Sequence, residues 1–99
     1  MLDSYTTSKR ADQDIKHITK RSLMDFGERQ TDTYMEGLEE TLEMLANCFD
    51  RGRTFLHSTN KRTYLHYKYV SHIVYYRQRK NDIFIVRILH IKMLPEKHL

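Results

Sequence analysis

The hydrophobic repeat of this chain changes its period near the midpoint, and this change constrains the fold more than any other feature. In the first half, apolar and small residues recur at spacings of three and four, which places them on one face of a helix. In the second half, β-branched and aromatic residues form short runs between turn residues, which is typical of strands. Helices followed by strands predict an α+β fold.

Two helices are predicted. Ser8 can cap the first helix with its hydroxyl group, and Gly27 can end it because glycine tolerates positive φ. The core-facing positions of this helix are Ala11, Ile15, Ile18 and Ser22. The second helix covers residues 28–48, and its core-facing positions are Thr31, Tyr34, Leu38, Leu42 and Leu45. The connection between the helices is so short that they should pack antiparallel as a hairpin.

The strand predictions are a leading strand over residues 2–7 and three strands over residues 63–69, 72–79 and 83–90. Residues 80–82 should form a hairpin turn, and residues 50–60 should form a loop. Strict alternation in the last strand would send Ile83, Ile85, Arg87 and Leu89 to one face and Phe84, Val86, Ile88 and His90 to the other. Pro95 should end extended pairing, which leaves residues 96–99 as a short tail or turn.

Length and composition predict a single domain over residues 1–99. Cys48 is the only cysteine, which fits a reducing compartment. The N-terminus carries no apolar run like that of a signal peptide, and no apolar stretch approaches the ~20 residues of a membrane helix. We therefore expect a soluble, cytoplasmic protein that does not engage a membrane.

Charge is divided unevenly between the two halves. Residues 1–50 hold six Lys/Arg and eleven Asp/Glu, a net charge of −5, whereas residues 51–99 hold eleven Lys/Arg and two Asp/Glu, a net charge of +9. Such asymmetry suggests a surface that meets an anion, either nucleic acid or an acidic protein segment. Basic residues interleaved with tyrosines suit single-stranded nucleic acid, although tyrosine is also an ordinary strand residue.

Several short motifs occur in an order that points to a known family. They are Phe26-Gly27-Glu28-x-Gln30, Ala46 followed by Gly52-Arg53, Tyr76-Arg77, Ile85, Arg87-Ile88-Leu89-His90, Met93, and the terminal His98-Leu99. In this order the chain resembles the ParE branch of the RelE/ParE toxin superfamily over nearly its whole length. It departs from the family pattern at Cys48-Phe49 and at Leu94.

The resemblance implies an N-terminal strand and an antiparallel helix hairpin packed on a small antiparallel sheet. It also implies a type II toxin that inhibits DNA gyrase by binding and is neutralised by a ParD-like antitoxin. DNA would be met only through the antitoxin, and no cofactor is expected. We expect the acidic, amphipathic antitoxin segment to contact Arg53, Arg62, Tyr64, Tyr76 and Arg77. The expected target-facing residues are Arg87, His90, Lys92, Met93 and His98.

An alternative function is ribosome-dependent cleavage of mRNA, as in the RelE branch. The groups available for phosphate binding and proton transfer would be Arg77, Arg87, His90 and His98. No tyrosine follows Tyr76, so the C-terminal aromatic residue typical of that branch is missing, and we favour a non-enzymatic toxin. Arg87 also has a structural interpretation, as an ion-pair partner of Asp14 or Glu43. The histidines show no metal-ligand spacing, so no metal site is expected.

Overall fold

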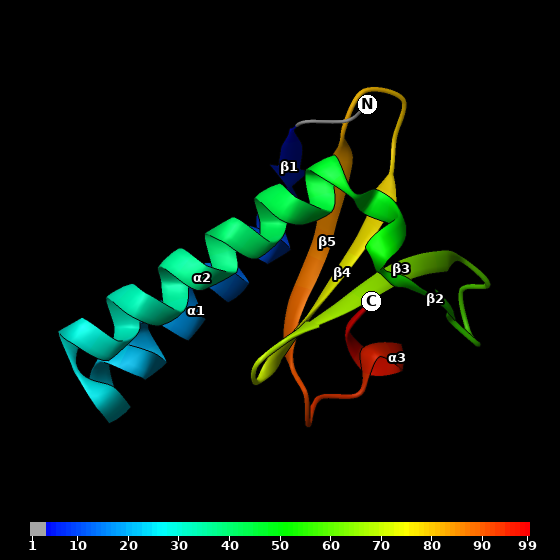
Figure 1. The fold of residues 1–99 in the computed structure, drawn as a ribbon. Helices are drawn as coiled ribbons and strands as arrows, with labels where there is room; N and C mark the ends of the chain where they lie inside the picture. The colour runs from blue at the N-terminus through cyan, green and yellow to red at the C-terminus, as the bar shows by residue number, and fades with distance from the viewer. Residues whose placement is uncertain (1–3) are drawn as a thin grey trace.

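The computed structural model describes residues 4–99 and confirms the predicted α+β fold (Figure 1). The elements in chain order are β1 (Tyr5–Thr7), α1 (Lys9–Phe26), α2 (Glu28–Asn47), the 3-10 helix η1 (Phe49–Arg51), β2 (Arg53–Leu56), β3 (Thr63–Tyr69), β4 (His72–Gln78), β5 (Ile83–His90) and α3 (Pro95–His98). The predicted leading strand forms as β1 over residues 5–7, and residues 2 and 3 lie outside the described residues.

The five strands form one sheet in the order β1-β5-β4-β3-β2. β3, β4 and β5 pair antiparallel, as predicted, and β2 pairs antiparallel with β3. β1 instead pairs parallel with β5 through Tyr5 opposite Ile83. Parallel neighbours need a long connection between them, and here the helix hairpin and three strands separate β1 from β5 in the sequence. The sheet is therefore mixed at one edge.

The prediction of a continuous loop over residues 50–60 is wrong. Within that segment, η1 is followed by β2, which pairs with β3 through Arg53 opposite His66 and Phe55 opposite Tyr64. β2 has only four residues, and three of them are exposed, so it shows little of the alternation that marks a strand. Pairing with β3, which the local sequence does not reveal, makes this segment a strand.

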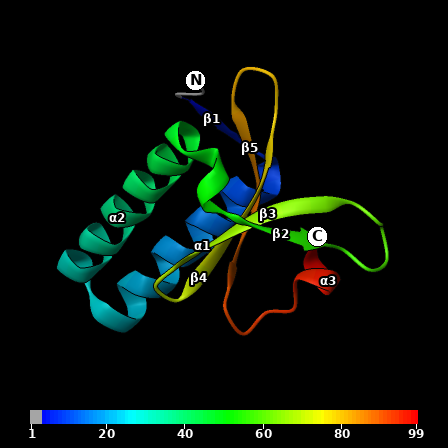
Figure 2. The ribbon, with the colours of Figure 1, turned by 45° about the vertical axis from the view of Figure 1, so that its right-hand side comes forward.

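The helix hairpin forms as predicted. The Ser8 hydroxyl oxygen accepts a hydrogen bond from the Ala11 amide (2.9 Å), and Gly27 joins the two helices at φ 85°. Figure 2 shows the hairpin and α3 on opposite sides of the sheet. The outward faces of both helices are charged, and none of the helices within residues 4–99 is long and apolar enough to cross a membrane.

The main core lies between the hairpin and the sheet. Its buried members are Ala11, Leu38, Leu42, Leu45, Ala46, Val74, Tyr76, Ile83, Ile85 and Ile88. Most of the predicted core-facing positions of the two helices are buried or half-buried there. One of them takes a polar partner, since the Thr31 hydroxyl group of α2 donates to the Ser22 hydroxyl group of α1 (2.8 Å).

The predicted alternation along β5 fails at Val86. Tyr76 lies opposite Ile85 and Tyr75 lies opposite Arg87, so Val86 is an extra residue in this ladder, as in a β-bulge. The bulge shifts the phase of the strand by one residue. Ile88 consequently joins Ile83 and Ile85 in the core under the helices, instead of facing away from them.

α1 covers the edge of β5 beyond the end of β1. The Ser8 amide donates to the Ile85 carbonyl oxygen (2.9 Å), and the Ser8 hydroxyl group donates to the Val86 carbonyl oxygen (2.7 Å). Two residues beyond Val86 on β5, the Ile88 amide donates to the carboxylate of Asp14 in α1 (3.0 Å). Backbone groups of β5 that would otherwise lie at an open sheet edge are therefore bonded to α1.

Candidate functional site

The C-terminal quarter of the chain is organised around Arg87. Its guanidinium group forms a bidentate ion pair with Asp14, with Nε 2.8 Å from Oδ2 and Nη2 2.9 Å from Oδ1. Its Nη1 donates to the carbonyl oxygen of His98 at 2.8 Å. The hydrogen bonds that Arg87 donates to Asp14 raise the pKa of Arg87, which stays charged. The interpretation of Arg87 as a structural ion-pair partner of Asp14 is confirmed.

Residues 96–99 were expected to be a short tail or turn, and most of them belong to a short helix. This helix, α3, packs against the loop between β2 and β3. His57 is 2% exposed, and its Nδ1 accepts from the amides of Thr59 and Asn60. Nε2 of His57 therefore carries the proton and donates to the Glu96 carbonyl oxygen (3.1 Å). The Ser58 hydroxyl group also donates to the Glu96 carboxylate, so long-range contacts hold the C-terminus in place.

Residues 91–94 form a loop between β5 and α3, which we call the C-terminal loop. Three backbone amides fix its course: Ile91 donates to the Ser71 carbonyl oxygen (3.0 Å), Lys92 to Nδ1 of His90 (3.2 Å), and Met93 to the His90 carbonyl oxygen (2.9 Å). Its side chains are nevertheless accessible, with Ile91 43% and Leu94 59% exposed, Lys92 exposed and Met93 half-buried. The loop thus presents apolar surface beside a cation on a fixed backbone.

The sequence predicts Lys92 and Met93 as target-facing residues but does not predict the exposed apolar residues Ile91 and Leu94 that flank them. Ile91 continues the apolar pattern of β5, so its exposure follows only from the end of strand pairing at His90. Leu94 stood out in the sequence only as a departure from the family pattern.

A histidine pair lies where β4 and β5 meet beside the C-terminal loop. His72 lies opposite His90, and their rings are 5.4 Å apart, edge to face. The Tyr34 hydroxyl oxygen lies 2.7 Å from Nδ1 of His72 and accepts from the Ser71 amide (3.3 Å). Burial, and then the neighbouring His90, lower the pKa of His72, whereas the Asp14 carboxylate opposes this shift. His72 is accordingly neutral at pH 7.

The four residues proposed for the alternative ribonuclease do not converge. Arg77 lies opposite Phe84 near the start of β5, whereas His90 ends that strand six residues later. At about 3.3 Å per residue, roughly 15–20 Å separates these positions along the strand, which is too far for one phosphate group. The guanidinium group of Arg87 is already bonded to Asp14 and His98. The structure therefore does not bring these four residues together, and their conditional assignment to one catalytic site stays a prediction.

Comparison with known proteins identifies the family. The model of a family described as ParE toxin of type II toxin-antitoxin system, parDE, matches residues 5–95. The chain belongs to the ParE toxin family. No curated protein matches it. A solved structure described as a chromosomal ParDE TA system from P. aeruginosa shares its fold, with a TM-score of 0.75 and 14% identity over 92% of this chain and 98% of that one.

Membership of the ParE family makes this chain the toxin component of a type II toxin–antitoxin system. Of the residues expected to contact an antitoxin, Tyr64 and Tyr76 are 4% and 0% exposed and add almost nothing to the surface of this ParE chain. Tyr76 instead donates from its hydroxyl group to the Phe49 carbonyl oxygen (2.7 Å). Arg53, Arg62 and Arg77 are exposed.

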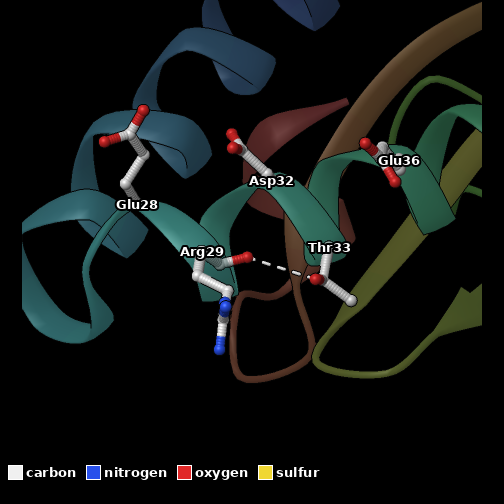
Figure 3. A pocket seen from close by; sticks show the side chains of 5 residues that line it. All are labelled: Glu28, Arg29, Asp32, Thr33 and Glu36. Carbon is white, nitrogen blue, oxygen red and sulfur yellow. Dashed lines mark hydrogen bonds between the residues drawn. The ribbon is translucent and has the colours of Figure 1, made fainter.

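Shallow depressions on the surface that residues 4–99 form include one on α2 and one at the turn between β4 and β5. Figure 3 shows the first, on the outward side of α2, where Thr33 donates to the Arg29 carbonyl oxygen (3.1 Å). The second surrounds the turn between β4 and β5, where Arg79 forms a bidentate ion pair with Asp82. Neither contains a residue predicted to contact the target. No group of three His, Cys, Asp or Glu residues within 4–99 is placed to hold a metal ion.

Proposed function

We propose that this ParE-family toxin inhibits DNA gyrase by direct contact and that the C-terminal loop, residues 91–94, makes this contact. The observation that carries the proposal is the combination of a fixed backbone with exposed side chains in that loop. A binding segment whose backbone is already ordered loses little conformational entropy when its partner binds. Family membership supplies the class of activity, and gyrase as the target would place the protein in the cytoplasm.

The chemistry of the loop suits recognition of a protein surface. Ile91 and Leu94 provide aliphatic surface, and Met93 provides a flexible side chain that adapts to an irregular partner. Lys92 lies between them and adds one charge. We assign Arg87, His90 and His98 a supporting role, because they hold the loop and the C-terminus in position. Inhibition through such contacts needs no chemistry from the toxin itself.

We also propose neutralisation by a ParD-like antitoxin whose disordered, acidic segment folds onto the toxin. The structural neighbour is a ParDE system, and the half of this chain after residue 50 carries a net charge of +9. Arg53, Arg62 and Arg77 would attract the segment at long range. Apolar anchors of the segment would need exposed apolar surface such as Met24 and Phe26 at the hairpin tip, which are 75% and 67% exposed.

The decisive experiment is a supercoiling assay with purified gyrase. The wild-type toxin should inhibit supercoiling, and the double variant Lys92→Ala/Met93→Ala should need at least about tenfold more protein, equivalent to about 1.4 kcal/mol of lost contact. Point changes are preferable to truncation, because α3 packs against His57 and its removal would expose that side chain.

Met24→Ala is the matched control, because it removes an equally flexible and more exposed methionine at the far end of the hairpin. It should inhibit gyrase as well as the wild type does. The proposal for gyrase would be rejected if wild-type toxin left supercoiling unchanged while it caused defined mRNA cuts on translating ribosomes. The assignment of the loop would be rejected if the double variant inhibited as strongly as the wild type.

A further inference from the structure

The side of the sheet that faces away from the hairpin carries a cluster of cations and rings. Tyr67 and Tyr69 of β3 pack against the core under the helices, as do Val74 and Tyr76 of β4. Because side chains alternate along a strand, their neighbours project from the opposite side. We call this opposite side the outer face, and its relevant members are Arg53, Phe55, His66, Lys68, Tyr75 and Arg77.

Strand pairing fixes how these groups are arranged. Arg53, His66 and Tyr75 are paired in a row across β2, β3 and β4. The rings of His66 and Tyr75 stack with centroids 6.1 Å apart and planes inclined by 28°. The half-buried Phe55 ring lies 6.3 Å from His66 and 6.1 Å from Tyr75. Tyr75 is only 3% exposed, so it supports the two rings that reach the surface at the centre of the outer face, those of Phe55 and His66, which form a small platform.

Three exposed cations surround this platform. Arg53 lies at the β2 end of the platform. Burial lowers the pKa of His66, and the charge of Arg53 lowers it further, so His66 is neutral at pH 7. Lys68 and Arg77 are each two residues from the row, on opposite sides of it. Two residues along a strand are about 6.6 Å, so the cations are spread over a surface about 10–15 Å wide. They form a triangle of charge around the rings.

These three cations have no carboxylate within ion-pair distance among residues 4–99. The two acidic residues after residue 50 are already engaged, since Asp82 bonds with Arg79 and Glu96 accepts from Ser58. Arg53, Lys68 and Arg77 thus keep an unneutralised charge, unlike Arg87, which Asp14 neutralises.

The apolar surface of the protein lies elsewhere. The large hydrophobic side chains that are exposed are at the hairpin tip, on β2 at Leu56, in the β3–β4 turn and in the C-terminal loop. None is a member of the outer face, because Leu56 alternates with Phe55 on β2. An amphipathic acidic peptide would find charge on the outer face but no exposed aliphatic side chain for its anchors. Nucleic acid carries phosphates and flat bases, which match the cations and the rings of the outer face.

We propose that the outer face binds single-stranded nucleic acid. Arg53, Lys68 and Arg77 contact backbone phosphates, and the half-buried rings of Phe55 and His66 contact the bases. Charge and stacking together are the usual basis of binding to single strands without sequence preference. This inference does not depend on gyrase as the target or on the role of the C-terminal loop, because it concerns a different surface. The outer face shares Arg53 and Arg77 with the residues proposed to attract the antitoxin, which would then compete with nucleic acid for these two cations.

The test is fluorescence anisotropy with a labelled thymidine oligonucleotide of about 12 nucleotides, titrated at several salt concentrations without gyrase. The triple variant Arg53→Ala/Lys68→Ala/Arg77→Ala should raise Kd at least about tenfold at low salt. Each phosphate contact to a single strand contributes about 0.7 to the slope of log K against log salt, so the slope should fall by about 2. Unfolding temperatures of all variants confirm that they are folded.

The matched control is Arg10→Ala/Lys16→Ala/Lys20→Ala, which removes the same charge from exposed positions of α1. It should change Kd less than threefold and leave the salt slope almost unchanged. Equal weakening by the two triple variants would show an effect of net charge alone and overturn the proposal. So would equal binding of a duplex of the same length. Tighter binding of a glutamate-rich peptide, lost only in the outer-face variant, would reassign the face to an acidic protein.

Discussion

The ion pair between Asp14 and Arg87 offers the sharpest test of how this fold is held together. The two side chains are 11% and 14% exposed, and the Asp14 carboxylate also accepts from the Ile88 amide, whose residue is 2% exposed. Asp14→Ala therefore leaves a largely buried guanidinium group without its counter-charge and a buried amide without its acceptor. Breaking a buried ion pair costs about 3–5 kcal/mol of stability. Because both side chains keep some exposure to solvent, we expect a loss at the lower end of this range, about 3 kcal/mol.

The loss should be measured as the free energy of unfolding in urea, with the slope m unchanged. For a chain of this length, about 3 kcal/mol lowers Tm by about 12–24 °C. Asp14→Asn should lose only about 1–2 kcal/mol of unfolding free energy relative to wild type, because its amide oxygen still accepts one hydrogen bond. The loss in the asparagine variant measures the missing charge. The additional loss in the alanine variant measures the missing hydrogen-bond acceptor.

Asp25→Asn provides the control, because Asp25 pairs with Arg21 on the exposed surface of α1, with side chains 44% and 81% exposed. Exposed pairs one helical turn apart contribute about 0.3–0.5 kcal/mol, so this variant should be almost as stable as the wild type. This expectation would be refuted if the free energy of unfolding of Asp14→Ala lay within about 0.5 kcal/mol of the wild-type value. Such a result would mean that solvent reaches Arg87 far more easily than its packing indicates.

Three further predictions concern contacts away from this pair. Gly37→Ala should lower Tm by several degrees, because a Cβ atom there collides with the Tyr69 hydroxyl oxygen; thermal unfolding measures it. Tyr76→Phe should cost about 1–2 kcal/mol in urea unfolding, because the Phe49 carbonyl oxygen loses its donor. Burial lowers the pKa of His72 below its ordinary value of 6.5, so the contribution of His72 to stability is complete above about pH 6.5 and is lost as pH falls through the folded pKa. NMR titration of the His72 ring should show this low pKa, and an unshifted value would contradict it.

The helices were predictable because their signals are local. Ser8 and Gly27 mark the ends of α1, and the spacing of apolar residues identifies the buried faces. β2 was not predictable in the same way, since its pairing partner β3 determines its conformation. The parallel partner of β1 lies more than seventy residues away in the sequence, beyond the reach of any local pattern.

The candidate site was predictable only in part. The family resemblance predicts Lys92 and Met93, and the structure places them in an accessible loop with a fixed backbone, but contact with a target stays a prediction. Tyr64 and Tyr76 are expected on the antitoxin surface, yet both are buried. Composition does not tell which face of the sheet a tyrosine occupies, and for these two the pairing and packing decide it.

The bulge at Val86 explains why one arginine connects so many parts of the molecule. Without the extra residue, strict alternation would place Arg87 under the helices, where a guanidinium group would displace apolar core. With it, Ile88 enters the core and Arg87 lies at the β5 edge that α1 covers. One carboxylate, Asp14, then bonds both the Arg87 side chain and the Ile88 amide, while Arg87 holds the His98 carbonyl oxygen. The course of the chain before and after the C-terminal loop is thus determined by a helix near the opposite end of the sequence.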